Sequence, residues 1–198
     1  MIHCITKQPI FDQLNVIDLM TGMGETWNLA YNYFPNSNLS GIDISDGMLS
    51  KAENKNIKLY KNKIKLYNQD VLNNDIPSES FDIVICAFGL KTFDLNQISN
   101  LAIQVERILK PGGKFSFIEI SKPSNFLLNA FYKFYLGKIT PIITWIFMGN
   151  PSEYKMLWKY IINFSNAKNA TEIFKNSGLK ATYKSYFYGC ATGFSGEK

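Results

Sequence analysis

The sequence predicts an α/β fold in which a mostly parallel sheet is flanked by helices on both faces. Short runs rich in β-branched residues alternate with longer stretches of helical character, which is the pattern of strand-helix-strand units. Glycines or acidic residues follow the first three predicted strands, where sheets of this kind bind ligands. With 198 residues, 46% of them hydrophobic, the chain has the size and composition of a single domain, residues 1–198.

Five strands are expected in the first two thirds of the chain. They are placed at residues 15–19, 39–44, 64–67, 82–87 and 114–121. The helices that connect them are placed at residues 24–33, 46–55 and 95–109. The first helix ends ahead of Pro35, the second begins on Asp46, an acid that can cap it, and the third ends at the turn formed by residues 110–113.

The alternation changes after the fifth strand. Residues 124–166 are expected to form three helical pieces, an insertion over the carboxyl edge of the sheet. A helix at 170–176 and two closing strands at 180–188 and 190–194 then complete a seven-stranded sheet. The insertion is dense in aromatic residues, which suits the wall of a substrate pocket and a well-packed helical subdomain equally well.

The charge pattern disfavours a nucleic-acid partner. The net charge is +5, but the basic residues are 20 lysines and the single Arg107, whereas reading of guanine and forked phosphate contacts favour arginine. Six of the lysines lie within residues 51–65, which suits an anionic membrane surface, although a solvated edge is the simpler interpretation. Charged residues and a proline interrupt the most apolar stretch, residues 126–148, so we expect no transmembrane helix.

The cysteines indicate a reducing compartment. Cys4, Cys86 and Cys190 have no metal-ligand spacing, and His3 is the single histidine that could join them, so we expect free thiols and no metal site. The N-terminal segment lacks the apolar core and cleavage site of a secretory signal. These features predict a cytoplasmic protein. Peripheral contact with the inner membrane face and a homodimer are left open.

The first strand runs into a glycine loop that contains Asp18, Gly22 and Gly24. Glycines at the carboxyl end of a strand let a ligand approach backbone N–H groups. The dinucleotide fingerprint needs a third glycine, and its place is taken by Trp27, whose ring is expected to obstruct close packing of helix on strand. A nicotinamide cofactor is therefore disfavoured. No Gly-Lys-Ser/Thr follows the glycines, so a Walker loop is excluded as well.

Acidic residues follow the next two strands. Asp43 lies 21 positions after the first glycine of the loop, which is the usual reach for a carboxylate that holds the hydroxyls of a ribose. A capping role for Asp43 is less favoured, because Asp46 already offers it. After the third strand, Asp70 suits the amino group of an adenine, with Val71 and Met48 covering the faces of the ring. An acid next to an apolar residue also commonly begins a loop, so only the place of this pair after the third strand favours a role in binding adenine.

In this order, the glycine loop and the two acids resemble the pattern of class I S-adenosylmethionine-dependent methyltransferases. Residues 81–91 (FDIVICAFGLK), 107–114 (RILKPGGK) and 118–123 (IEISKP) are similar to the ubiquinone/menaquinone biosynthesis C-methyltransferase family. The resemblance covers nearly the whole chain from Val16 onward. It implies a Rossmann-like fold with a seven-stranded, mostly parallel sheet, and S-adenosyl-L-methionine as the cofactor.

The resemblance also implies methyl transfer to a ring carbon of a small aromatic or quinol acceptor, such as a prenylated quinol. It implies the following cofactor-binding residues: Asp18, Gly22, Gly24, Asp43, Ile44, Met48, Asp70, Val71 and Ala87. Within this set, the glycine loop and its acid hold the methionine part of the donor. The acid after the second strand holds the ribose, and the pair after the third strand holds the adenine.

Three residues are candidates for helping the acceptor's hydroxyl lose its proton, namely Lys91, Glu119 and Tyr135. A histidine base is disfavoured because His3 lies away from every motif. Family members usually carry Arg-Asn after Phe-Gly-Leu, where this chain has Lys91 and Thr92. Lysine keeps a charge that stabilises a phenolate but lacks the planar fork, which leaves open a different acceptor. Glu119 is alternatively a hydrogen-bonded strand end, and Tyr135 a core aromatic.

A second departure from the family lies at the start of the chain, where only fifteen residues precede Val16 in place of a longer helical region that closes over the cofactor. Three interpretations of this departure stay open: an unusually open donor site, a cover supplied by a partner, and a shortened form of the chain. Two alternatives to ring C-methylation stay open as well. One is an O-, N- or C-methyltransferase of specialised metabolism on the same scaffold. The other is a subunit of a quinone-biosynthesis assembly that binds the cofactor without transferring its methyl group. The fold alone does not separate them.

Overall fold

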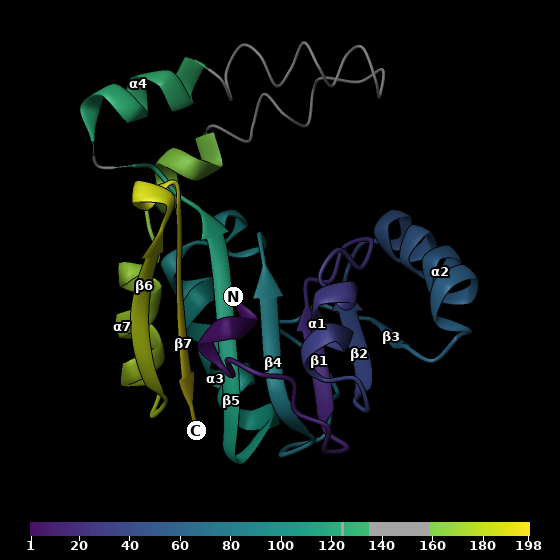
Figure 1. The fold of residues 1–198 in the computed structure, drawn as a ribbon. Coiled ribbons are helices and arrows are strands. Elements are labelled where there is room, and N and C mark those ends of the chain that lie inside the picture. Colours follow the sequence, from purple (N-terminus) through teal and green to yellow (C-terminus); the bar gives the residue numbers. More distant parts are fainter. Residues whose placement is uncertain (124, 135–158) are drawn as a thin grey trace.

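The computed structural model describes residues 1–123, 125–134 and 159–198, and its centre is a seven-stranded sheet (Figure 1). The strands are β1 (Asn15–Leu19), β2 (Asn38–Asp43), β3 (Lys65–Asn68), β4 (Phe81–Ala87), β5 (Leu109–Ile120), β6 (Lys180–Tyr186) and β7 (Ala191–Glu197). Their order in the sheet is β3-β2-β1-β4-β5-β7-β6, with β1 to β5 parallel and β7 antiparallel to both of its neighbours. The predicted fold class is confirmed.

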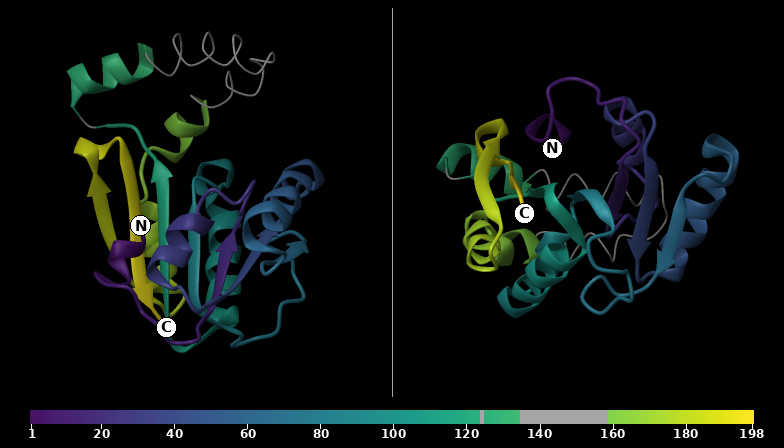
Figure 2. Two further views of the ribbon diagram at one scale, coloured as in Figure 1. Left: turned by 45° about the vertical axis from the view of Figure 1, so that its right-hand side comes forward. Right: turned by 90° about the horizontal axis from the view of Figure 1, so that it is seen from below.

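Successive residues of the central strands alternate between two buried clusters, as strand geometry requires. Val16 and Ile83 face one cluster, whereas Ile17 and Val84 face the other. The first cluster is covered by η1 (Ile2–Cys4), α1 (Trp27–Tyr33) and α2 (Asp46–Tyr60), and the second by α3 (Leu95–Ile108) and α7 (Lys168–Asn176). The view from below separates η1 from α3 and α7 (Figure 2).

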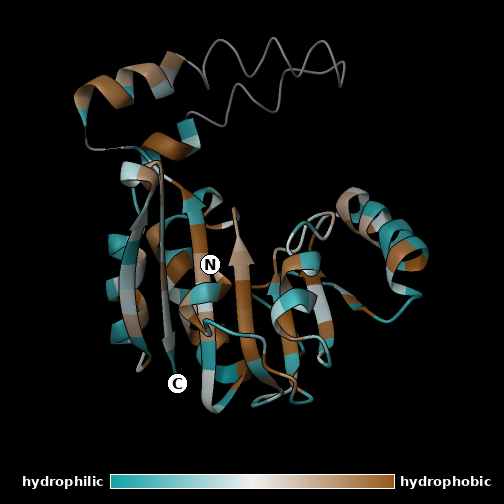
Figure 3. Ribbon diagram, in the orientation of Figure 1, coloured by the Kyte–Doolittle hydropathy of each residue, from teal (hydrophilic) through white to brown (hydrophobic). Residues whose placement is uncertain are grey.

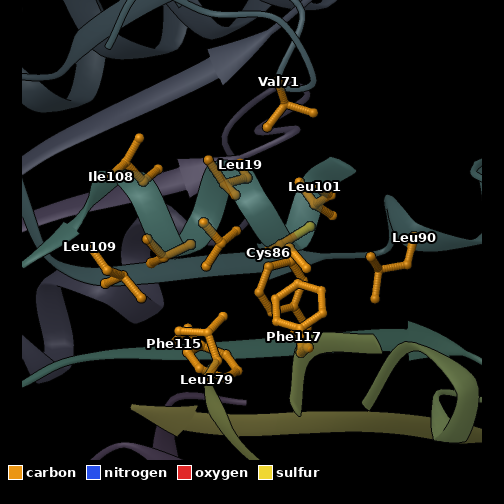
Figure 4. Close-up of a cluster of buried hydrophobic side chains, with 14 of the residues drawn as sticks. Leu19, Val71, Cys86, Leu90, Leu101, Ile108, Leu109, Phe115, Phe117 and Leu179 are labelled. Carbon is orange, nitrogen blue, oxygen red and sulfur yellow. The ribbon is translucent and has the colours of Figure 1, made fainter. Parts of the chain in front are cut away.

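The α3 side of the sheet holds the larger cluster, and aromatic rings fill its centre (Figure 4). Phe117 and Phe194 stack with centroids 5.0 Å apart, and Phe174 from α7 meets Phe194 edge-on at 4.7 Å. Such contacts contribute about 1 kcal/mol each beyond their burial. They tie β5, β7 and α7 into a rigid support behind the carboxyl edge of the sheet.

Two of the expected helix boundaries are wrong, and the third helix ends within one residue of its predicted end. The first helix was expected from residue 24, but α1 begins at Trp27, since Gly22 and Gly24 take positive φ values and keep the loop out of helical geometry. The second helix continues to Tyr60 and stops at Lys61, which adopts a left-handed conformation. The third ends at Ile108, at the 110–113 turn that was predicted to stop it.

The strand ends differ from expectation as well. β5 begins at Leu109 rather than at residue 114, and the 110–113 turn forms an irregularity in its pairing with β4. The first closing strand is two residues shorter than predicted, because Phe187–Gly189 forms a 3-10 turn. The second continues to Glu197, since its whole length pairs with both β5 and β6.

Part of the expected insertion is described. α4 (Phe126–Phe134) is mostly hydrophobic and lies beyond the carboxyl end of β5, with Phe126, Leu127 and Phe131 exposed (Figure 3). Residues 159–164 are helical. Residues 124 and 135–158 of the insertion lie outside the described residues, and Tyr135 with them. None of the helices described in residues 1–134 and 159–198 is long and apolar enough to cross a membrane.

Candidate functional site

A cavity of about 500 Å³ lies at the carboxyl ends of β1 and β4, on the α1 side of the sheet. Leu29, Met48, Ala87, Phe88 and Ile118 supply apolar walls. Polar groups come from the glycine loop, which passes from β1 to α1. The combination of apolar walls and a few convergent polar groups is typical of a small-molecule site.

Asp18 supplies the buried carboxyl group of this cavity. It lies in β1 and is 1% exposed. Its Oδ2 accepts hydrogen bonds from the hydroxyls of Thr21, at 2.6 Å, and Thr26, at 2.5 Å, while its Oδ1 has no partner among the described residues. Burial raises the pKa of the Asp18 carboxyl to about 7, although the two threonine bonds favour the ionised form.

An unpaired oxygen in a buried carboxyl is costly unless a ligand completes it. The group that fits best is a cationic hydrogen-bond donor such as an ammonium, because it gives Asp18 Oδ1 a hydrogen-bond partner and gives the carboxylate a counter-charge. The ammonium and sulfonium of S-adenosylmethionine therefore suit a cavity with this carboxyl and apolar walls. The residues present fit the cofactor that the sequence predicted.

The glycine loop is held by Asp43. The backbone N–H of Gly22 donates to Asp43 Oδ2 at 2.8 Å, and the backbone N–H of Ser45 donates to Oδ1 at 2.9 Å. The two strand ends that were predicted to share a ligand are thus directly joined. Asp43 lies beside the cavity rather than in its wall.

Trp27 does not obstruct the packing of α1, contrary to the expectation from the sequence. Its ring is fully buried in the cluster between α1 and the sheet. A Cβ atom at Gly24 would lie 2.4 Å from the ring, so the second glycine of the loop makes room for the indole. The indole N–H donates to Thr21 Oγ1 at 2.9 Å. Trp27 is therefore part of the polar network that surrounds Asp18.

The structure brings four of the predicted cofactor residues into the cavity wall, namely Asp18, Gly22, Met48 and Ala87. The others lie elsewhere. Ile44 is 68% exposed ahead of α2, and Val71 is buried in the α3-side cluster that Figure 4 draws. Asp70 accepts a hydrogen bond from the backbone N–H of Leu72 at 2.9 Å and does not line the cavity, and neither does Gly24.

Several residues of the cavity were not predicted. The hydroxyls of Thr21 and Thr26 bind Asp18, and the signal in the sequence is their place on either side of the glycines, directly after the strand that carries Asp18. Phe88 and Ile118 come from the ends of β4 and β5. The sheet order places these ends beside the glycine loop, so Ile118 could be located only once that order was known.

The candidates Lys91 and Glu119, predicted separately, form one ion pair. Lys91 Nζ lies 3.3 Å from Glu119 Oε1, and the backbone N–H groups of Lys91 and Ile120 also donate to the Glu119 carboxylate. The Glu119 side chain is fully buried, and burial raises its pKa while Lys91 opposes that effect. Lys91 Nζ also donates to the carbonyl of Phe88, a residue of the cavity wall.

A second cavity of about 490 Å³ begins at Lys91 and extends between α3, α7 and the helical residues 159–164. Its lining includes Phe93, Tyr160 and Phe164 together with the carboxamides of Gln97, Asn163 and Asn166. Phe88 lines the first cavity and Lys91 the second, so the segment from Phe88 to Lys91 borders both. In the described part of the chain, no group of three or more His, Cys, Asp or Glu side chains is placed to hold a metal ion.

The sheet order, the antiparallel β7 and a glycine-loop cavity with an acidic residue define a class I S-adenosylmethionine-dependent methyltransferase. The model of the ubiE/COQ5 methyltransferase family matches residues 3–198. The chain therefore belongs to the ubiE/COQ5 methyltransferase family.

Two curated relatives are named demethylmenaquinone methyltransferase. The protein of Lactococcus lactis is 29% identical over 171 residues, which is 85% of this chain and 66% of the relative. That of Oceanobacillus iheyensis is 30% identical over 185 residues, 92% of this chain and 76% of the relative. A solved structure described as a SAM-dependent methyltransferase from Aquifex aeolicus is similar in fold, with 15% identity, a TM-score of 0.64, and coverage of 98% of this chain and 87% of that one.

Proposed function

We propose that the chain transfers the methyl group of S-adenosylmethionine to a ring carbon of a small aromatic or quinol acceptor. One observation carries the donor half of the proposal: the cavity at the glycine loop holds a buried carboxyl oxygen, Asp18 Oδ1, that has no partner within the described residues. The acceptor half is supported by the similarity to two proteins named demethylmenaquinone methyltransferase, at 29% and 30% identity.

We assign the donor's methionine part to the glycine loop, where Asp18 faces the ammonium and Gly22 lies in the cavity wall, while Gly24 shapes the loop from outside that wall. Asp43, next to that loop, holds the ribose. Met48 and Ala87 supply apolar contacts. Ile44 and Asp70, outside the cavity wall, are assigned to the adenosine end, whereas Val71 is buried in the α3-side cluster and is assigned no contact. The bound donor supplies an activated methyl group, so the work of the protein is alignment of the reactants and exclusion of water.

We assign Lys91 to the acceptor. Lys91 lines the second cavity, and its ammonium donates to the carbonyl of Phe88 in the wall of the first, so we place it to stabilise the oxygen anion of a phenol or quinol. Glu119 positions Lys91 and does not act as a free base, because three N–H donors already occupy its carboxylate. Tyr135, outside the described residues, is kept as a candidate contact of the acceptor.

The test is transfer of an isotope-labelled methyl group from S-adenosylmethionine to a panel of hydroquinones, with and without a prenyl tail, simple phenols and amines. We expect a ring C-methylated hydroquinone, identified by mass and by the carbon shift of the new methyl group. Transfer to oxygen or nitrogen alone would favour the specialised-metabolism alternative. Donor binding without transfer to any acceptor would favour the non-transferring subunit.

A prenylated acceptor resides in a membrane, so we also propose that the protein works on the cytoplasmic face of the inner membrane. Lys58 and Lys61 are exposed on the segment 51–65 and suit an anionic surface. Sedimentation with anionic vesicles should fall for Lys58→Gln/Lys61→Gln and fall further as salt shortens the Debye length to about 3 Å near 1 M. The control is Lys7→Gln/Lys114→Gln, which removes the same charge elsewhere. Equal sedimentation of the two variants would contradict this assignment.

A further inference from the structure

Trp27 is linked to Asp18 through Thr21. The indole N–H of Trp27 donates to Thr21 Oγ1 at 2.9 Å, and Thr21 Oγ1 donates to Asp18 Oδ2 at 2.6 Å. All three side chains are buried. Lys55 holds the other side of the indole, with its ammonium 5.6 Å from the ring centroid and bonded to the carbonyl of Gly24. The indole therefore has one fixed orientation relative to the loop.

This arrangement decides where a proton on Asp18 resides. The Thr21 hydroxyl has one proton, and because its oxygen already accepts from Trp27, that proton is directed at Asp18 Oδ2. The Thr26 hydroxyl is directed at the same oxygen. Oδ2 is thus an acceptor of two hydrogen bonds, and a proton bound to the carboxyl resides on Oδ1, the atom without a partner among the described residues.

We propose that Trp27 is a positioning residue that acts through Thr21 to present Asp18 Oδ1 as a site where the donor's ammonium group replaces a proton. The proposal rests on the proposed function and deepens it. Without the indole N–H, the Thr21 oxygen is free to accept a proton from the carboxyl, which stabilises neutral Asp18 and weakens its attraction for a cation. Trp27 thereby tunes donor affinity without touching the donor.

The exchange is balanced in atoms and charge. Neutral Asp18 and the ammonium of the donor give a carboxylate paired with that ammonium, and one proton leaves to solvent. Below the pKa of Asp18, binding brings in one ammonium charge and releases one proton, so these two charges cancel. Because a proton is released, donor affinity should rise with pH until Asp18 is ionised in the free protein.

The charged and titratable groups around Asp18 favour this exchange. Glu25, in the loop, and Asp43, at the end of β2, both raise the pKa of Asp18. On β4 the buried Cys86 thiol has a raised pKa and stays neutral. From the N-terminal segment, the amine of Met1 belongs to a residue of the same cavity wall. Two of these neighbours are anionic, so a ligand cation also relieves their repulsion of the Asp18 charge.

The experiment is calorimetric titration of S-adenosylmethionine into the wild-type chain and Trp27→Phe between pH 5.5 and 7.5, in pairs of buffers with different ionisation heats, which counts released protons. The free amino group of the donor stays mostly protonated in this range, since α-amino groups have pKa values of about 8. Carboxyl carbon shifts of Asp18 in the free protein give a second readout that needs no ligand.

For the wild-type chain we expect release of about one proton per donor at pH 6 and an affinity that rises about tenfold per pH unit below pH 7. Trp27→Phe should move the midpoint of both readouts to higher pH. Its affinity deficit should be about tenfold at pH 6 and about threefold at pH 7.5 if the pKa of Asp18 rises by about one unit. Phe34→Leu, a truncation elsewhere in the same cluster, is the control and should leave the midpoint in place.

Thr21→Val, which removes the hydroxyl at nearly constant shape, is the second variant and should move the midpoint in the same direction, whereas Thr21→Ser should keep it. If Trp27→Phe does not fold, the titration of the Asp18 carboxyl carbon in Thr21→Val tests the proposal instead. A deficit in Trp27→Phe that is constant with pH, or donor binding by the wild type without proton release, overturns this inference alone. A wild-type chain that binds no donor overturns the proposed function together with it.

Discussion

The two buried carboxyl groups at the carboxyl edge of the sheet differ in how much of their bonding capacity the protein itself uses. Glu119, in β5, accepts from two backbone N–H groups and from the ammonium of Lys91. Asp18, in β1, is buried to a similar extent, but its bonds come from two hydroxyls on one oxygen, and the other oxygen has no partner in the described residues.

The difference indicates which of the two is built for a ligand. A carboxylate paired with a lysine and bonded to backbone N–H groups is satisfied within the fold, and its removal harms the fold. A carboxyl with one free oxygen in a cavity costs stability until a cation arrives. Two equally buried carboxyl groups therefore have different roles, Glu119 in the fold and Asp18 in ligand binding. Each of the following measurements distinguishes these roles.

The largest difference is expected in how stability depends on pH. The pKa of Asp18 is raised from 3.8 to about 7 in the folded chain, so its ionisation costs stability as pH rises. The contribution is fully present below about pH 4, is lost progressively between pH 4 and 7, and amounts to about 4 kcal/mol. Asp18→Asn should lack this loss, so the free energies of unfolding of variant and wild type should diverge between pH 4.5 and 7.5.

If the free energies of unfolding of wild type and Asp18→Asn change in parallel with pH across that range, the pKa of Asp18 is not raised by folding. The matched comparison is Glu119→Gln, in which the pH dependence should change less. The Glu119 carboxylate has a bound lysine that offsets the effect of burial on its pKa.

The next effect is on stability at constant pH. Glu119→Gln leaves Lys91 without its counter-ion and should lower the free energy of unfolding by about 3 kcal/mol at pH 7. The double variant Lys91→Met/Glu119→Gln should recover most of that loss, because it removes both charges. Denaturant unfolding with a circular dichroism readout measures each value. If the loss of stability in the double variant equals the sum of the losses in the two single variants, the two side chains are not energetically coupled and the assigned ion pair is contradicted.

Donor affinity is expected to show the reverse pattern. Asp18→Asn replaces a charge-assisted hydrogen bond by a neutral one and should weaken the binding of S-adenosylmethionine by about 2 kcal/mol, roughly thirtyfold, at pH 7.5. Calorimetric titration provides the measurement. Lys91→Met, which alters the other centre, should bind the donor within about twofold of wild type. Comparable losses in both variants would mean that the pair of Lys91 and Glu119 also supports donor binding.

The smallest effect should come from Thr26→Val. It removes one of the two hydroxyl bonds to Asp18, each of which lowers the pKa of that carboxyl. The pKa should therefore rise, and donor affinity at pH 7 should fall by about 1 kcal/mol, roughly fivefold. Following the affinity with pH checks the cause, since the deficit should shrink toward pH 8. A deficit independent of pH would indicate a direct contact with the donor instead.

The sequence was sufficient for the fold because each strand alternates residues between two buried clusters, and the chain signals most of its turns with glycine, proline and caps. It also located Asp18, Gly22, Met48 and Ala87 at one cavity, since the carboxyl ends of parallel strands meet at one edge. The boundaries of α1 and β5 were wrong, because positive φ values and strand pairing, rather than local propensity, set them.

What the sequence could not give were contacts between distant elements. The pairing of Lys91 with Glu119 joins residues 28 positions apart through the neighbouring strands β4 and β5. The role of Trp27 was misjudged for the same reason. Its ring was expected to obstruct packing, whereas the absence of a Cβ at Gly24 makes the space that it fills.

The most direct test of the account is a crystal structure with S-adenosylhomocysteine bound. We predict that the amino nitrogen of this product lies within hydrogen-bond distance of Asp18 Oδ1, that Thr21 and Thr26 keep their bonds to Oδ2, and that the Lys91 to Glu119 pair is unchanged. A product molecule bound elsewhere, or one whose amino group leaves Asp18 Oδ1 without a partner, would contradict it.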